Sequence, residues 1–83
     1  MAIDYGALRS LTARELIAAL TQDDFYFVRQ RGPHQRYRHP DGRRFTVAPH
    51  GKGDTFKVKT LKGMIEDQAC WTEDDLRRLK LIR

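Results

Sequence analysis

Residues 25–48, FYFVRQRGPHQRYRHPDGRRFTVA, decide the fold. This stretch contains three short runs rich in aromatic and β-branched residues, and such runs predict strands: 25–30, 35–39 and 45–48. Gly32-Pro33 separates the first two runs and Pro40-Asp41-Gly42 separates the last two, and both sequences are typical of turns. Strands joined by tight turns predict a three-stranded antiparallel sheet.

Helical patterns lie on both sides of this stretch. Thr12 and Glu15 have the spacing of a capping box and precede apolar residues at helical spacing. A second apolar stripe begins at Leu61, and Thr72 precedes a third pattern with acidic residues in its first turn. The expected helices cover residues 12–21, 58–69 and 73–81.

The order of these elements is α-β-β-β-α with a short helix added at the C-terminus. It predicts one α+β domain over residues 1–83, with the helices on one face of the sheet and the other face open. Gly63 lies within the second helix and is expected to mark a close packing contact. Cys70 is expected to be a buried thiol.

Alternation along the strands predicts which side chains face the helices. The apolar residues of the second and third strands must point inward, and Phe25 or Phe27 joins them from the first. The expected core comprises one of these phenylalanines with Tyr37, Phe45, Val47, Leu16, Ile17, Leu61, Ile65 and Trp71.

The same alternation gathers a histidine and several arginines on the open face: His34, Arg36, Arg38 and Arg44. Arginine binds phosphate oxygens through two parallel hydrogen bonds, and histidine titrates near neutral pH. The cluster therefore predicts a site for a phosphodiester. Its alternative is an ordinary solvated strand face, since outward arginines usually need no partner.

Three further residues bear on the role of this cluster. Lys59 lies at the start of the second predicted helix, where contact with a nucleic-acid backbone is expected. His50 lies in a loop and is a candidate second acid or base. His39 precedes a proline in a turn and is expected to be structural. The spacing of the histidines matches no zinc pattern, so no metal or other cofactor is expected.

Composition restricts the partners. Lysine and arginine outnumber aspartate and glutamate by 16 to 11 in 83 residues, which gives a net charge of +5. This balance favours a polyanionic partner, either nucleic acid, an acidic protein or an anionic membrane. No apolar run is long enough to cross a bilayer, and among these partners a membrane is not expected. The single cysteine suits the reducing cytoplasm.

The residues from Phe25 to Pro40 resemble the HicA-type toxins. The likeness continues through the Asp41-Gly42 turn, the Thr46–His50 strand end, Thr60-Leu61, Gln68-Ala69 and Trp71-Thr72-Glu73, and so extends over nearly the whole chain. No one of these motifs is highly specific, but their order is. Two positions depart from the family pattern, because Pro33 replaces a small hydroxylic residue and Asp24 replaces a glycine.

The resemblance implies a fold like that of a double-stranded-RNA-binding domain. It also implies a ribonuclease toxin that cleaves messenger RNA and pairs with a HicB-type antitoxin, which binds over the active site. The family's catalytic histidine corresponds to His34, the residue that alternation places beside the arginines. The expected mechanism is metal-independent, with arginines that stabilise the charge of the transition state.

Two other functions fit the same residues. A non-enzymatic RNA-binding module has this layout and reads duplex RNA by its shape. A protein-interaction domain that docks an acidic partner needs only the basic surface. Replacing His34 separates the enzyme from the binding module, because only the enzyme requires this side chain.

Overall fold

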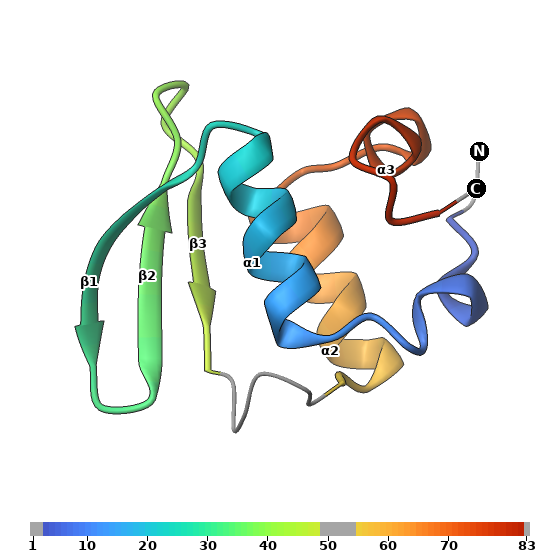
Figure 1. Cartoon of the computed structure of the whole chain (residues 1–83), viewed down its shortest axis with the longest axis horizontal. Helices are drawn as coiled ribbons and strands as arrows, with labels where there is room; N and C mark the ends of the chain where they lie inside the picture. Colours follow the sequence, from blue (N-terminus) through green and yellow to red (C-terminus); the bar gives the residue numbers. More distant parts are fainter. Residues whose placement is uncertain (1–2, 49–54, 83) are drawn as a thin grey trace.

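The computed structural model of the chain describes residues 3–48 and 55–82. The elements follow the predicted α-β-β-β-α order, with a further 3₁₀-helix before them and a short helix after them (Figure 1). Their bounds are η1 (Tyr5–Leu8), α1 (Ala13–Gln22), β1 (Tyr26–Arg31), β2 (His34–Arg38), β3 (Arg44–Val47), α2 (Val58–Lys62), η2 (Gly63–Gln68) and α3 (Glu73–Arg78).

Two of the three predicted helices begin with a capping box. The hydroxyl of Thr12 accepts a hydrogen bond from the amide of Glu15 at 3.2 Å, and the Glu15 carboxylate accepts one from the Thr12 amide at 3.0 Å. Thr72 and Asp75 repeat the arrangement at the start of α3. These reciprocal bonds satisfy amides that the helices leave unpaired at their first turns.

The sheet is antiparallel with strand order β1-β2-β3, as the turn sequences predict. Each observed strand begins and ends within one residue of its predicted range. The β1–β2 turn consists of Gly32 and Pro33, and Gly32 has φ of +58°. Glycine adopts this left-handed conformation without steric penalty, which explains its place in so tight a turn.

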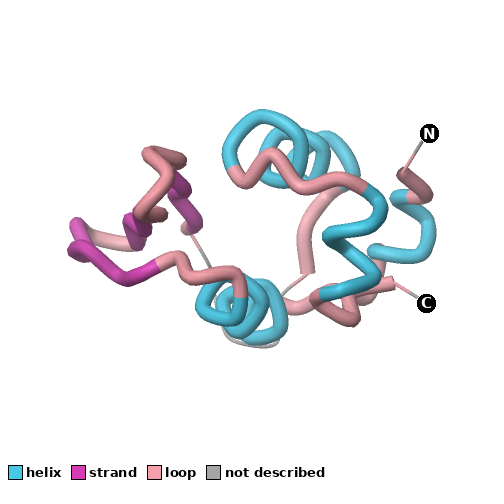
Figure 2. The backbone as a smooth tube through the Cα atoms, turned by 90° about the horizontal axis from the view of Figure 1, so that it is seen from above, coloured by secondary structure: helices cyan, strands magenta, loops and turns pink. Residues whose placement is uncertain are grey.

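One face of the sheet is buried against the helices. Figures 1 and 2 show α1 and α2 together beside the sheet, nearest β3, with β1 farthest from both. All six residues of β1 are consequently exposed. The core confirms the predicted set, and Phe25 rather than Phe27 is the buried one of the two phenylalanines. The buried residues of this set are Phe25, Tyr37, Phe45, Val47, Leu16, Leu61, Ile65 and Trp71, and Ile17 packs against them half-buried.

The second predicted helix is irregular. It begins as α2 and continues from Gly63 as η2, one stretch of π-helix. The expectation of a close contact at Gly63 is wrong, because a Cβ built there meets no atom within 4 Å. The glycine marks the change of helical pitch instead.

Cys70 corrects a second expectation. Its side chain is exposed rather than buried, and its φ of 56° lies in the left-handed region. The turn between η2 and α3 rotates this residue outward while its neighbours Ala69 and Trp71 point into the core. A helical stripe continued through residue 70 would miss this rotation.

Candidate nucleic-acid interface

The outward residues of β2 and β3 form the base of the candidate site. His34, Arg36, Arg38 and Arg44 are all exposed, whereas Tyr37 is buried. Arg36 lies opposite Thr46, and Arg38 lies opposite Arg44, across the β2–β3 pair. The strand register that alternation predicts is therefore the observed one.

A β-bulge adds a residue that sequence reasoning missed. The β1–β2 register shifts between Phe27 and Arg29, so that Phe27 lies opposite Tyr37 and Arg29 lies opposite Arg36. Without the extra residue Val28, strict alternation would place Arg29 on the same face as Phe27. The shift brings Arg29 onto the open face. Only the pairing with β2 reveals it, because a bulge depends on the neighbouring strand.

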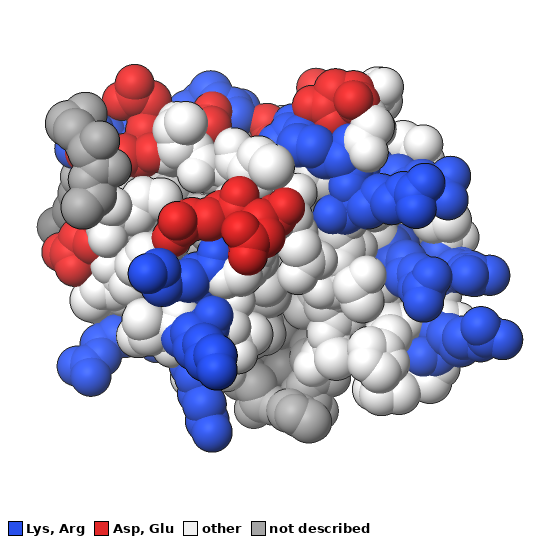
Figure 3. Space-filling model, turned by 180° about the vertical axis from the view of Figure 1, so that it is seen from behind, with Lys and Arg blue, Asp and Glu red and all other residues white. Residues whose placement is uncertain are grey.

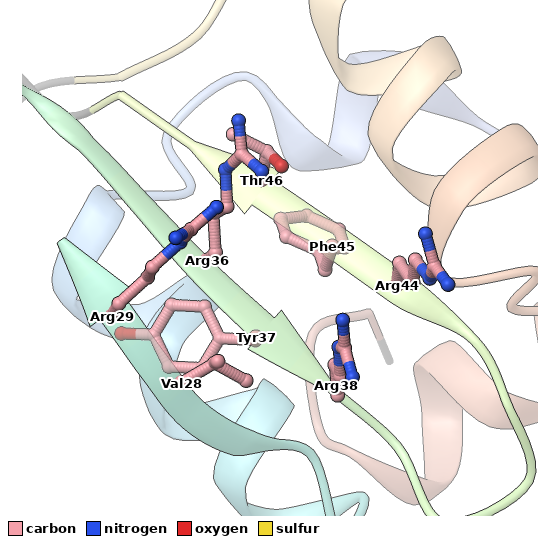
Figure 4. A pocket seen from close by; sticks show the side chains of 8 residues that line it. All are labelled: Val28, Arg29, Arg36, Tyr37, Arg38, Arg44, Phe45 and Thr46. Carbon is pink, nitrogen blue, oxygen red and sulfur yellow. The ribbon is translucent and has the colours of Figure 1, made fainter. Parts of the chain in front are cut away.

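A hollow of about 310 Å³ lies on this face of the sheet. Figure 4 shows Arg29 and Arg36 reaching toward each other at one end, with Arg38 and Arg44 at the other. The remaining lining residues are Val28, Tyr37, Phe45 and Thr46. We call this the sheet hollow.

A second hollow, of about 670 Å³, lies between the edge of the sheet and the helix α2–η2. It contains His34 from the start of β2 and Lys57 and Lys59 from the start of α2. We call it the histidine hollow. The fold thus brings His34 and Lys59 to one surface, although nothing in their sequence spacing required it.

Hydrogen bonding holds the wall of the histidine hollow in place. The Gln68 side-chain oxygen accepts a hydrogen bond from the Thr46 amide at 2.8 Å, which ties η2 to β3. Both residues line the histidine hollow, and Thr46 lines the sheet hollow as well. The two hollows are therefore neighbours across β3.

The predicted site residues divide into two groups along β2. His34 and Arg38 are the first and last residues of this strand. Four residues at about 3.3 Å each put their backbones roughly 13 Å apart. Arg38 and its partner Arg44 therefore lie toward the opposite end of the strand from His34, whereas Lys57 and Lys59 share the histidine hollow.

Of the other two histidines, the structure describes His39 but not His50. The Nδ1 atom of His39 accepts a hydrogen bond from the Asp41 amide at 3.1 Å, and its ring lies 5.0 Å from that of Phe25. These contacts fit a structural residue, as expected. His50 lies outside the described residues.

Charge is distributed unevenly over the surface. In Figure 3 one group of lysine and arginine side chains lies along the side formed by the sheet, a second group projects from the opposite lower part of that view, and acidic side chains gather elsewhere. Across residues 3–48 and 55–82, no group of three or more His, Cys, Asp and Glu side chains is placed to hold a metal ion. No helix in these ranges is long and apolar enough to span a membrane.

Comparison with known proteins assigns the chain to a family. Residues 13–69 match the family model described as the HicA toxin of bacterial toxin–antitoxin systems. No curated protein and no solved structure matched the chain in parallel searches. The matched segment runs from the first residue of α1 to the residue after η2, and so includes the whole sheet and both hollows. The chain therefore belongs to the HicA toxin family.

Proposed function

We propose that this toxin is a metal-independent endoribonuclease that cleaves messenger RNA in the cytoplasm, with His34 as its proton-transfer residue. One observation carries the proposal: His34 is exposed in the same hollow as Lys57 and Lys59. An imidazole can accept a proton from the 2′-hydroxyl of the substrate, and two neighbouring cations can bind the phosphate that this hydroxyl attacks.

The proposed reaction is an internal displacement. His34 accepts the proton of the ribose 2′-hydroxyl, and the 2′-oxygen forms a bond to the adjacent phosphorus. The bond from phosphorus to the 5′-oxygen of the next nucleotide breaks, and that oxygen takes up a proton. The products are a 2′,3′-cyclic phosphate and a 5′-hydroxyl. His50 stays the candidate for the second proton transfer.

The cations of the histidine hollow have a separate role in this proposal. Lys57 and Lys59 stabilise the negative charge that grows on the non-bridging phosphate oxygens. Arg31 of β1 is the cross-strand partner of His34, and Arg36 lies two residues from His34 on the same face of β2, roughly 7 Å along the strand. Arg38 and Arg44 are assigned to binding rather than to the reacting phosphate.

The proposal is tested by measuring how fast the purified proteins cleave a messenger RNA transcript in the presence of a chelator. His34→Ala should cut at least 100-fold more slowly than the wild type, since a positioned acid or base contributes about 10²–10⁴-fold. Its unfolding free energy should change by less than about 0.5 kcal/mol, because the side chain is exposed. His39→Ala is the matched control and should keep its cleavage rate.

The chemistry of the ends gives a second readout. Direct labelling of the new 5′ ends by a polynucleotide kinase, without prior phosphatase, should succeed. Cleavage by His34→Ala at the wild-type rate would place the reaction elsewhere. If neither protein cuts RNA but both bind it, the chain is an RNA-binding module, the alternative that the arginine surface also supports.

Membership of the family implies an antitoxin partner. We infer that a HicB-type antitoxin covers the surface that holds His34. Such a partner would block the histidine hollow without needing the imidazole itself. His34→Ala should therefore bind the antitoxin with nearly wild-type affinity, which isothermal titration calorimetry would measure.

A further inference from the structure

Two pairs of like charges lie directly opposite each other on the open face of the sheet. Arg29 is the cross-strand partner of Arg36, and Arg38 is the cross-strand partner of Arg44. Like charges at directly opposed positions destabilise an antiparallel sheet. Both repulsive pairs form when the free protein folds, and both lie in the sheet hollow.

Acidic residues do not relieve that repulsion in the part of the chain that the structure describes. The ion pairs found there involve other cations, such as Arg43 and Arg78, which both contact Asp23. The four arginines of these two pairs are exposed and line the sheet hollow. A cluster of cations that form no ion pair with the described acidic residues is suited to a ligand that brings its own negative charge.

The spacing of the two pairs indicates the form of that ligand. Arg36 and Arg38 are separated by two residues of β2, or roughly 7 Å. Each pair can hold one phosphate, so the ligand needs two phosphates in line along the strand. An extended nucleic-acid backbone provides successive phosphates at a comparable spacing.

A neighbouring aromatic side chain favours nucleic acid over a simple polyphosphate or an acidic peptide. Tyr26 is the cross-strand partner of Arg38, so both side chains lie on the open face, and Tyr26 is 50% exposed. Exposed aromatic rings beside a basic track are platforms on which bases stack. Tyr26, Arg38 and Arg44 thus form one row across the sheet.

We propose that the pairs Arg29–Arg36 and Arg38–Arg44, with Tyr26, form an exosite for an extended RNA strand, next to the phosphate that reacts at His34. The inference rests on the proposed ribonuclease function for its position in the substrate. The exosite holds the strand roughly two nucleotides away from the scissile bond, since Arg38 lies at the far end of β2. It contributes to affinity and leaves the chemical step to the histidine hollow.

Two substrates of different length separate these roles. The short one is a dinucleoside monophosphate, and the long one is a hexadeoxynucleotide with a single ribonucleotide at its centre, so that both contain one cleavable bond. The wild type should have a KM at least tenfold lower for the long substrate, because charge-assisted contacts to even one additional phosphate give about this factor.

The test variant is the double substitution Arg38→Gln and Arg44→Gln. It should lose the advantage of the long substrate through a KM at least tenfold higher, with kcat changed less than threefold and cleavage of the dinucleotide unchanged. Its melting temperature should equal or exceed that of the wild type, because a repulsive pair has been removed. The matched control, Arg9→Gln with Arg14→Gln, removes the same charge from exposed positions outside the sheet and should behave as wild type.

Binding of the all-deoxy hexamer, followed by fluorescence anisotropy, tests the exosite without any cleavage. The wild type and the control should bind it equally, the arginine variant at least tenfold more weakly, and Tyr26→Leu about fivefold more weakly or worse. Equal affinity of the arginine variant and the control would overturn the exosite. Loss of dinucleotide cleavage in the arginine variant would overturn it too, by placing these arginines in the reaction. If no RNA is cleaved but the pattern of binding holds, the ribonuclease proposal fails and the exosite stands.

Discussion

Trp71 donates its indole N–H to the carboxylate of Asp23, with 2.8 Å between Nε1 and Oδ2. Asp23 directly follows α1 and Trp71 lies shortly before α3, so the bond links the end of α1 to the start of α3. Arg78 donates to the other oxygen of the same carboxylate at 2.6 Å, and Arg43 lies 3.3 Å from Oδ2. Asp23 is only 8% exposed and is the one charged residue that the described core buries.

Replacement of Asp23 should therefore destabilise the fold. We expect Asp23→Ala to lower the unfolding free energy by about 2–3 kcal/mol, because it leaves the buried indole N–H without an acceptor and separates two cations from their shared anion. Urea denaturation followed by tryptophan fluorescence would measure the loss. Asp67→Ala, at an exposed acid of η2, is the control and should stay within about 0.5 kcal/mol of the wild type. A similar small change in Asp23→Ala would mean that this network does not support the fold.

The same carboxylate should make stability depend on pH. Burial alone would raise the pKa of Asp23, but hydrogen bonds from Trp71 and Arg78 and the charges of Arg43 and Arg78 together hold it below its usual value. A lowered pKa means that the stabilisation is complete above the unfolded-state value, about 3.9, and is lost as the pH falls through the folded-state value.

Comparison with Asp23→Asn isolates this carboxylate, because the other acids with lowered pKa values are common to both proteins: Glu15, Asp41 and Asp75. The wild type should exceed the variant in unfolding free energy near neutral pH, and the difference should shrink below about pH 4. Denaturant titrations at several pH values give the two curves. A difference that is constant down to about pH 2 would contradict the assignment.

The capping box at the start of α1 should contribute measurably to stability. Thr12→Ala removes the acceptor for the Glu15 amide and should lower the unfolding free energy by about 1 kcal/mol. Thr21→Ala is the matched control within the same helix, because the Thr21 hydroxyl donates only to the Ile17 carbonyl, which is already in the helical ladder. Its stability should be unchanged or slightly higher. Equal losses in the two variants, measured by thermal melting, would show that the cap contributes nothing.

Gly63 should tolerate a methyl group with a gain in stability. Its φ of −60° is helical, and a Cβ there would meet no atom within 4 Å. Gly63→Ala should therefore raise the unfolding free energy by about 0.4–1 kcal/mol, mainly because alanine has less freedom to lose on folding. A destabilised variant in the same urea titration would indicate that the π-helical stretch requires glycine.

Several features could be predicted from the sequence because their causes are local. The capping boxes at Thr12 and Thr72 link residues three positions apart, so their spacing alone reveals them. The turns at Gly32 and Gly42 depend on a positive φ that glycine adopts freely. Alternation placed Tyr37 inward and His34 outward because a strand side chain has only two directions available.

What the tertiary structure decided involves partners that are distant in the chain. The bulge at Val28 turns Arg29 onto the open face, and it exists only through pairing with β2. Lys59 joins His34 in one hollow because α2 returns along the edge of the sheet. Asp23 accepts a hydrogen bond from Trp71, a residue 48 positions away in the chain. Sequence patterns report which face of an element is apolar, but the contacts between elements depend on how the elements pack together. The hollows of this toxin, and the division of its cations between them, are therefore properties of the assembled fold.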